Sequence, residues 1–332
     1  MAVLVTGATG FVGRHVAYAL LETGCEVRAL VHPGRVPPIK HKNLTITEGD
    51  ICDRASLVKA VRGCEGVFHV AALYALWSRT PQRMYDVNVS GTRNLMEVAT
   101  EAGVRRIVYT STVAAVKFHP PPRLGNEEED PDPEDLVGHY KKSKYQAEML
   151  VRHMSSQGTP VVIVNPTTPI GPGDAKPTPT GRVVLDILRK RIPAYVKTGL
   201  NLVAVEDVAT GHLLAMDRGQ IGRRYILGHR NVTLKQFLDM TARIARVKPP
   251  LWCIPHIFAL TAAYLDLIIE GKVLRREPHV PIEGVRQSSK YMWVDCSRAI
   301  SELGLPQSPI EDALERAVYW YTVNGYVKGQ KR

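Results

Sequence analysis

Short apolar runs alternate with segments of helical periodicity through the first half of the chain. The apolar runs predict strands at residues 3–5, 26–31, 45–48, 66–70, 106–110 and 161–165. Apolar residues recur at helical spacing over about 12–23, 55–62, 87–102 and 140–155. Strands that alternate with helices form right-handed crossovers and a parallel sheet. The pattern therefore predicts an α/β fold with a doubly wound, parallel Rossmann-type sheet.

The regular alternation of strands and helices ends after about residue 165. Five prolines between 166 and 179 are expected to interrupt regular structure. Shorter strands and helices follow at 201–204, 208–216, 224–227 and 234–245. For a chain of 332 residues, we expect a Rossmann domain at 1–165. Residues 166–332 are expected to form mainly a smaller, C-terminal substrate-binding lobe, with some segments returning to the Rossmann domain.

Two segments stand apart from this pattern. Residues 118–138 are rich in proline and acid and are expected to form a solvated loop. Residues 258–269 form an apolar helix that could be a core helix, a lid over an apolar substrate, or a face that touches a membrane. We favour the first two interpretations, and the third leaves peripheral membrane contact open.

Charge and cysteine usage narrow the class of protein. Lys and Arg number 43 against 32 Asp and Glu, which gives a net charge of +11 and favours anionic ligands. We expect no nucleic-acid binding, because no recognition motif accompanies this charge. The five cysteines are scattered without a C-x-x-C pair, so we predict no metal site and no disulfide framework. With no signal peptide or spanning run in view, we expect a cytoplasmic protein.

Three glycines, Gly7, Gly10 and Gly13, follow the first predicted strand and open the first helix. A dinucleotide pyrophosphate needs backbone N–H donors at a helix N-terminus and no side chains in the way, and glycines supply both. The placement of the motif predicts a dinucleotide site, which also includes Thr9, Phe11 and Val12. Farther along, Asp50 and Ile51 follow the third strand, where a carboxylate can accept a hydrogen bond from the adenine amino group.

The residues after the second strand bear on the choice of cofactor. NAD-binding domains usually place Asp or Glu there to hold the ribose 2′-hydroxyl, and this strand has no acid in reach. Basic side chains can instead hold a 2′-phosphate. The sequence therefore favours NADP(H), with NAD(H) possible, and the candidate phosphate ligands are Arg14, Arg28, His32 and Arg35.

Tyr140 and Lys144 form the strongest catalytic pattern in the chain. Residues four apart lie on one face of a helix, and a nearby ammonium group favours the phenolate form of tyrosine. We therefore expect Lys144 to lower the pKa of Tyr140 toward the range of a general acid–base. Ser111 and Thr112, at the carboxyl end of the fifth strand, are placed to polarise a substrate oxygen.

These motifs resemble those of the extended short-chain dehydrogenases/reductases. The matching residues are 6–13 (TGATGFVG), 88–94 (NVSGTRN), 109–112 (YTST) and 140–144 (YKKSK). Within that superfamily the chain is similar to the dihydroflavonol 4-reductase-like group, and most similar to the bacterial hopanoid-associated sugar epimerase family. That similarity is carried by residues 67–72 (VFHVAA), 74–77 (YALW), 165–172 (NPTTPIGP), 176–181 (KPTPTG) and 198–201 (TGLN).

The resemblance implies a role for each site residue. Tyr140 would exchange the proton, Lys144 would also bind the nicotinamide ribose, and Thr112 would stand where relatives carry Ser, with Ser111 as the alternate. His32 stands where NADP-using relatives often carry Arg. Cofactor contacts would extend to Ala71, Ala72, Pro166 and Thr167. A substrate pocket would be lined by Tyr74, Trp77, Thr112, Thr168 and Lys176.

Three functions remain open at this point. The first is NADPH-dependent reduction of a ketone or aldehyde to an alcohol, with Tyr140 as proton donor. The alternative is an NAD-dependent sugar epimerase or dehydratase that retains its cofactor, because the same residues serve both. A remote alternative is a non-catalytic NADP-sensing protein. The expected ligand is a small carbonyl, alcohol or sugar, and a homodimer is possible, as is usual in relatives.

Overall fold

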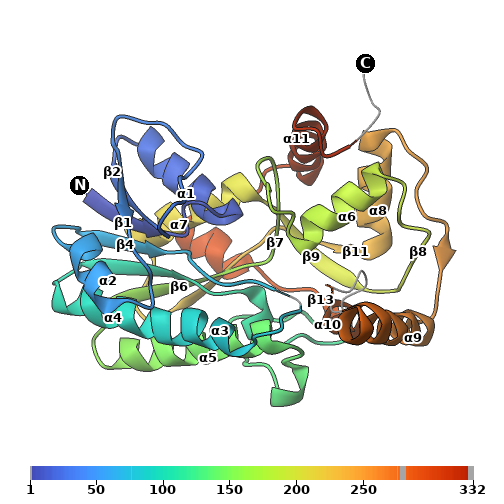
Figure 1. The fold of residues 1–332 in the computed structure, drawn as a ribbon, viewed down its shortest axis with the longest axis horizontal. Coiled ribbons are helices and arrows are strands. Elements are labelled where there is room, and N and C mark those ends of the chain that lie inside the picture. Colours follow the sequence, from blue (N-terminus) through green and yellow to red (C-terminus); the bar gives the residue numbers. More distant parts are fainter. Residues whose placement is uncertain (1, 76, 275, 277–281, 328–332) are drawn as a thin grey trace.

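The computed structural model describes every residue except 1, 76, 275, 277–281 and 328–332. Its centre is a seven-stranded parallel sheet with the order β10-β6-β5-β4-β1-β2-β3 (Figure 1). The strands are β1 (Ala2–Thr6), β2 (Glu26–Val31), β3 (Leu44–Glu48), β4 (Gly66–His69), β5 (Arg106–Thr110), β6 (Val161–Pro166) and β10 (Arg224–Leu227). The predicted α/β fold with a doubly wound parallel sheet is confirmed.

Helices cover both faces of this sheet (Figure 1). One face carries α1 (Phe11–Glu22) and α7 (Val205–Arg218). The other face carries α2 (Arg54–Val61), α4 (Thr92–Glu101) and α5 (His139–Ser156). Along β1, Val3 and Val5 pack on the first face and Leu4 on the second. Burial on both faces explains why these strands are continuous apolar runs.

A second, smaller sheet forms a separate core beside the first. Its order is β11-β9-β13, and β7 also pairs with β9. The strands are β7 (Thr168–Ile170), β9 (Gly199–Ala204), β11 (Arg230–Thr233) and β13 (Tyr291–Met292). It is covered by α6 (Pro179–Leu188), α8 (Leu234–Ala245) and α11 (Ile310–Val323). After β9 the chain returns to the large sheet, because α7 packs in the core of that sheet and β10 is one of its strands.

The remaining elements lie at the edges of these cores. A two-stranded sheet joins β8 (Ala194–Tyr195) to β12 (Trp252–Cys253). It leads into α9 (His256–Asp266), the π-helical turn η4 (Leu267–Val273) and α10 (Ile282–Gln287). The short helices are α3 (Gln82–Tyr85), η1 (Asp86–Gly91), η2 (Val113–Ala115), η3 (Pro133–Asp135) and η5 (Ala299–Leu303). In the part of the chain that is described, no helix is both long and apolar enough to cross a membrane.

The proline-rich stretch interrupts regular structure only in part, at residues 171–178, which include Pro172 and Pro177. Pro166 ends β6, Pro169 lies inside β7, and Pro179 is the first residue of α6. Proline suits the first turn of a helix, where its missing N–H has no partner to lose. Thr178 precedes it and caps α6 by accepting a hydrogen bond from the Gly181 N–H. Pro166 and Pro179 therefore mark boundaries of elements.

The acidic segment is also not the solvated loop that its composition suggested. Glu127 is buried and accepts a hydrogen bond from the Ile226 N–H in β10 (2.9 Å). Asp130 contacts the guanidinium groups of Arg152 and Arg224, each at 2.8 Å. These contacts fasten the segment over the end of the large sheet, because each carboxylate finds a partner there.

A buried ion pair lies at the centre of this arrangement. Arg224 of β10 is 5% exposed and Glu148 of α5 is 1% exposed, and their charged atoms are 3.0 Å apart. Glu148 also accepts from the Asn165 side-chain amide (2.7 Å), which donates in turn to the backbone oxygen of Thr112 (3.0 Å). The pair thus joins the catalytic helix, two strands and the predicted oxygen-polarising residue.

Removing one member of this pair should be costly. We expect Arg224→Met to lower the free energy of unfolding by about 3–5 kcal/mol, because it leaves the Glu148 carboxylate buried without its cation. Denaturant unfolding at neutral pH measures this. The matched control is Arg223→Ala, which removes a surface pair with Glu302 and should cost less than about 1 kcal/mol. Equal losses in the two variants would contradict a special role for the buried pair.

Candidate active site

The Gly-rich turn connects β1 to α1 in a conformation that other residues resist. Gly7 has φ +78°, and a Cβ there would lie 2.7 Å from the Ala71 nitrogen. A Cβ on Gly13 would lie 2.2 Å from the Gly7 oxygen. Gly10 donates its N–H to that same oxygen (2.8 Å), and no side chain caps α1. The turn thus presents the N-terminus of α1 without side chains in the way. Thr9 beside it is exposed, and Phe11 and Val12 are half-buried.

A buried chain of hydrogen bonds fixes this turn against the loop after β4. The Ala71 N–H donates to Thr6 Oγ1 (3.1 Å), which lies 2.8 Å from His69 Nδ1. On the other side, His69 Nε2 lies 2.9 Å from Thr92 Oγ1. Thr92 donates its hydrogen to the Asn88 oxygen (2.6 Å), so it accepts from Nε2–H. The chain therefore requires a neutral imidazole, and burial lowers the pKa of His69 to about 3.

Tyr140 and Lys144 lie one turn apart on α5, as the spacing predicts. Lys144 Nζ, however, donates to the Tyr109 hydroxyl (3.0 Å) and to the Thr110 backbone oxygen (2.7 Å). The Tyr140 side chain instead lies beside that of Thr112. The helix face therefore brings the expected residues to the carboxyl end of β5, but the ammonium group is directed at the strand.

The electrostatics of this pair differ from our expectation. Burial raises the pKa of Tyr140 above its usual value, and the Thr112 hydrogen bond only partly opposes this. Burial lowers the pKa of Lys144 to about 7, against the opposing effect of Glu148. The predicted lowering of the phenol pKa by Lys144 is therefore not observed in the protein alone. Desolvation is the largest effect on Tyr140, and the phenol remains protonated at neutral pH.

Two hydroxyl groups follow β5 at the site. Thr112 Oγ1 accepts from the Ala114 N–H (3.2 Å) and so begins η2. Ser111 is 5% exposed, and its Oγ is buried without a hydrogen-bond partner. Buried polar atoms normally find a partner. The Ser111 hydroxyl is thus available to a molecule that completes the site.

Two residues to which the motifs assigned no role contact the elements around the site. Asn88, in η1, accepts from the Leu73 N–H (2.7 Å) and donates to Ser143 Oγ on α5 (3.0 Å). Glu283, in α10, lies with its carboxylate against the start of α5, beside Gly138 and His139. A Cβ on Gly138, where φ is +86°, would collide with the Glu283 carboxylate. These contacts set the position of the catalytic helix.

A sequence signal existed for some of the missed residues. Glu148 continues the spacing of Tyr140 and Lys144 by another four residues, so all three share a helix face. Asn88 begins a motif that the resemblance already contained. No local pattern indicates Arg224 or Glu283, because their partners are distant in sequence.

The four basic residues predicted for a 2′-phosphate do not lie together. Arg28 is in mid-strand and donates to the backbone oxygens of Ala60 and Arg62, both at 2.7 Å, at the end of α2. Arg14 is directed at the Pro172 oxygen (3.5 Å). His32 and Arg35 are exposed in the loop that follows β2. Of the four, His32 and Arg35 are the exposed residues that follow the carboxyl end of β2.

The other predicted cofactor residues lie along the carboxyl edge of the large sheet. Asp50 follows β3, where its carboxylate accepts from the Cys52 N–H (2.9 Å) and lies 3.6 Å from His32 Nε2. Ile51 is buried beneath Gly91. The remaining four residues follow the ends of their strands: Ala71 and Ala72 after β4, and Pro166 and Thr167 at the end of β6.

The predicted substrate residues are more dispersed. Tyr74 packs edge-on against Tyr140, with ring centroids 4.3 Å apart. Trp77 instead stacks with the Arg79 guanidinium group. Thr168 is half-buried in β7, and Lys176 is exposed in the turn before α6. Of the five, the structure brings Tyr74 and Thr112 next to Tyr140.

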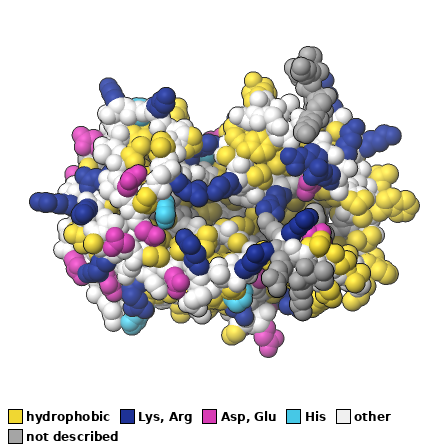
Figure 2. All heavy atoms as spheres, in the orientation of Figure 1, with side chains coloured by type: hydrophobic (Ala, Val, Ile, Leu, Met, Phe, Trp, Pro, Cys, Tyr) yellow, Lys and Arg dark blue, Asp and Glu magenta, His cyan; other side chains and the backbone are white. Residues whose placement is uncertain are grey.

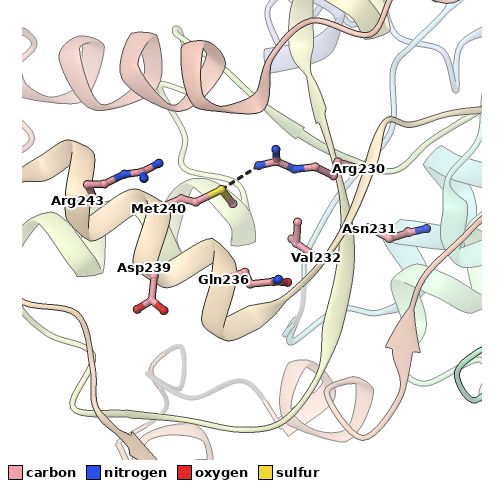
Figure 3. Close-up of a pocket in the computed structure, with 7 residues that line it drawn as sticks. All are labelled: Arg230, Asn231, Val232, Gln236, Asp239, Met240 and Arg243. Carbon is pink, nitrogen blue, oxygen red and sulfur yellow. Dashed lines mark hydrogen bonds between the residues drawn. The ribbon is translucent and has the colours of Figure 1, made fainter.

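A cavity of about 480 Å³ in the smaller lobe lies apart from these residues. It is bounded by β11 and α8, and Arg230 and Arg243 project over it (Figure 3). Arg230 already contacts Met240 Sδ (2.9 Å) and Glu311 (2.8 Å). The cavity contains none of the predicted catalytic residues, so it does not mark the reaction site. It is lined by Arg230, Asn231, Val232, Gln236, Asp239, Met240 and Arg243.

The chain's own residues fit a nicotinamide dinucleotide. A Cβ would fill the turn at Gly7 and Gly13, the N-terminus of α1 lacks a side-chain cap, and Ser111 has an unpartnered hydroxyl directly after β5. All of these features lie at the carboxyl edge of a doubly wound sheet, where ligands bind in such folds. Fold and site together define a Rossmann-type protein of the dinucleotide-binding class.

Comparison with known proteins assigns the family. Residues 3–228 match the NAD dependent epimerase/dehydratase family, and the chain belongs to it as an extended short-chain dehydrogenase/reductase. Members of this family are NAD(P)-dependent oxidoreductases or epimerases. The family resemblance stated from the motifs is thereby confirmed.

Individual relatives cover nearly the whole chain. A Synechocystis protein named "Putative dihydroflavonol 4-reductase" is 47% identical over 98% of this chain and 96% of its own length. Sterol demethylase protein B of Methylococcus capsulatus is 34% identical over 98% of this chain and 100% of its own. The crystal structure of gox2253 is 42% identical, covers 98% of this chain and 99% of its own, and superposes with a TM-score of 0.87.

The buried histidine predicts a pH dependence of stability. The folded protein holds His69 neutral down to about pH 3, whereas the unfolded chain protonates it near 6.5. The free energy of unfolding should therefore fall as the pH is lowered from about 6.5 towards 3. We expect His69→Gln to reduce the loss of stability between pH 7 and pH 5, as measured by denaturant unfolding.

The control is His153→Gln, at an exposed position in the last turn of α5. This variant should show the same difference in the free energy of unfolding between pH 7 and pH 5 as the unmodified protein. A slope unchanged by His69→Gln would contradict the assignment of the neutral imidazole.

Proposed function

We propose that this protein is an NADP(H)-dependent carbonyl reductase, which reduces a ketone or aldehyde to an alcohol. One observation carries the proposal. A protonated phenol, Tyr140, lies close to the Thr112 hydroxyl at the carboxyl end of β5, on the edge of the sheet that also bears the Gly-rich turn. Two hydroxyl donors side by side are suited to a carbonyl oxygen.

The mechanism follows from where the chain holds its protons. When bound, the nicotinamide supplies the hydride. Thr112 and Tyr140 hold the substrate oxygen, and Tyr140 donates its proton to that oxygen as negative charge develops there. A raised phenol pKa keeps this proton in place at neutral pH, as a donor requires. Lys144, beside the end of β5, would bind the nicotinamide ribose, and the orphan Ser111 hydroxyl lies nearby.

The cofactor preference rests on the loop after β2. No residue of the loop itself is acidic, and His32 and Arg35 are exposed, although Asp50 lies 3.6 Å from His32 and Glu48 accepts from the Gly34 N–H. A 2′-phosphate suits these two groups better than Arg28, which the α2 carbonyl groups already hold. Asp50 and Ile51 would contact the adenine, and the N-terminus of α1 would bind the pyrophosphate.

The names of the relatives support a carbonyl substrate with substantial apolar surface. One is named as a dihydroflavonol reductase and another as a sterol demethylase protein. In this chain Tyr74 lies against Tyr140 and offers an aromatic wall to such a substrate. We include Trp77, Thr168 and Lys176 in the proposal as outer contacts of the substrate.

A second candidate function is sugar epimerisation or dehydration with a retained NAD. It is favoured by the family that the chain matches, whose description names epimerases and dehydratases. The same Tyr140, Lys144 and Thr112 would serve it, so the residues of the site do not separate the two. The fate of the cofactor does, because an epimerase recycles its cofactor within one catalytic cycle whereas a reductase must exchange it.

The role of Tyr140 is tested by Tyr140→Phe. The variant lacks the transferable proton, so we expect kcat for carbonyl reduction to fall at least a hundredfold, in line with the usual size of acid–base contributions. NADPH affinity, followed by fluorescence titration, should change less than threefold. The control is Tyr145→Phe, five residues farther along the same helix, whose hydroxyl makes no hydrogen bond to the described residues of the site. Unchanged turnover in Tyr140→Phe would overturn the assignment.

The choice between the two functions is tested on the purified, undialysed protein. We expect denaturation to release no stoichiometric NAD, as identified by mass, and the apo protein to bind NADPH more tightly than NADH. Arg35→Ala should weaken NADPH binding about tenfold and leave NADH binding within twofold. Stoichiometric NAD that resists dialysis would instead establish the epimerase, and equal effects on the two nucleotides would exclude Arg35 as a phosphate ligand.

A further inference from the structure

The apolar helix at 258–269 is neither a core helix nor a covered one. In α9 the one fully buried residue is Ala263, while Ile257 is 62% exposed and Phe258 is 64% exposed. Nearby, Trp252 of β12 is 76% exposed and Leu251 is 77% exposed. The interpretation of this segment as a core helix is therefore wrong. Large apolar side chains gathered on a surface mark an interaction site.

The exposed side of this helix has a consistent chemistry. Its exposed residues fall at helical spacing and carry no charge: Ile257, Phe258, Thr261, Ala262, Tyr264, Leu265, Ile268 and Ile269. The helix is nevertheless held in place. His256 Nε2 lies 2.7 Å from the Val285 oxygen of α10, and Arg286 donates to the Tyr264 hydroxyl. The apolar face thus belongs to a helix whose position is fixed by contacts with α10.

Basic side chains border this apolar face. The pairing of β8 with β12 joins two segments, 187–205 and 240–265, that contain no Asp or Glu, and the acid that follows, Asp266 at the end of α9, is half-buried. Seven cations lie in these segments, and all are exposed: Arg189, Lys190, Arg191, Lys197, Arg243, Arg246 and Lys248. Figure 2 shows hydrophobic side chains gathered at the β12 and α9 end of the molecule, with Lys and Arg side chains above them.

We propose that this face, formed by β8, β12 and α9, docks the protein on the surface of an anionic lipid bilayer. An apolar helix face inserts into the interface between headgroups and acyl chains, and adjacent Lys and Arg attract anionic headgroups. A second copy of the chain fits less well, because two copies of so basic a surface repel each other. The inference does not depend on which reaction the site carries out.

The test uses the full-length protein and vesicles of defined composition. A flotation assay compares vesicles of phosphatidylcholine alone with vesicles that also contain about 30% phosphatidylglycerol, an anionic lipid. We expect binding to the anionic vesicles that weakens as salt is raised. Trp252 is the exposed tryptophan among those described, so its fluorescence should shift to shorter wavelength on binding.

Two sets of variants separate the apolar and basic contributions. Ile257→Ser with Phe258→Ser should lower the partition coefficient at least tenfold and remove the fluorescence shift. Arg191→Gln with Lys248→Gln should lower it several-fold and flatten its salt dependence. The matched controls are Tyr319→Ser, 70% exposed on α11, and Lys59→Gln, exposed on α2, which should bind as the unmodified protein does. Thermal unfolding verifies that each variant is folded.

Three outcomes would overturn the proposal. The first is that the unmodified protein binds neither kind of vesicle. The second is that the controls lose binding as much as the variants of this face, which would place the lipid contact elsewhere. The third is that light scattering shows a dimer which only the apolar variants dissociate, without vesicle binding. That result would assign the face to a second copy of the chain.

Discussion

The active site depends on a salt bridge that takes no direct part in chemistry. Arg224 and Glu148 pair at 3.0 Å inside the protein, and through Asn165 the pair reaches the backbone oxygen of Thr112. Because a buried charge without its partner is costly, β10, β6 and α5 must meet in one arrangement. That arrangement places the hydroxyl of Thr112 beside the Tyr140 phenol. The acidic segment around Asp130 is held over the sheet by the same arginine.

Burial governs the protonation of the site more than neighbouring charge does. It raises the pKa of Tyr140 and lowers that of Lys144 to about 7 and that of His69 to about 3. In each case the low-dielectric interior disfavours the charged form. A neutral phenol next to a second hydroxyl is a donor pair ready for an oxygen atom. The neutral imidazole of His69, meanwhile, holds the Gly-rich turn through Thr6.

The catalytic helix also connects the site to the surface of the smaller lobe. Glu283 in α10 lies against the start of α5, and α10 in turn holds α9 through His256. The exposed apolar face is therefore joined to the reaction site through two helices. A carbonyl substrate with much apolar surface and a docking face for lipid are compatible features, because both involve apolar chemistry.

The sequence by itself determined the parallel sheet, the order of its elements and the residues of the Gly-rich turn, Tyr140, Lys144 and Thr112. These depend on local periodicity, on glycine and on fixed spacing along one helix, all of which a single chain displays. The tertiary structure alone decided which groups contact the residues in those patterns. Arg28 was expected near a phosphate but lies on the carbonyl groups of α2, and Lys144 is directed at β5. The acidic segment became part of an ion network, and an apolar helix remained exposed. Each outcome turns on a partner distant in the chain, and the free energy of burying or pairing a group is set by that partner.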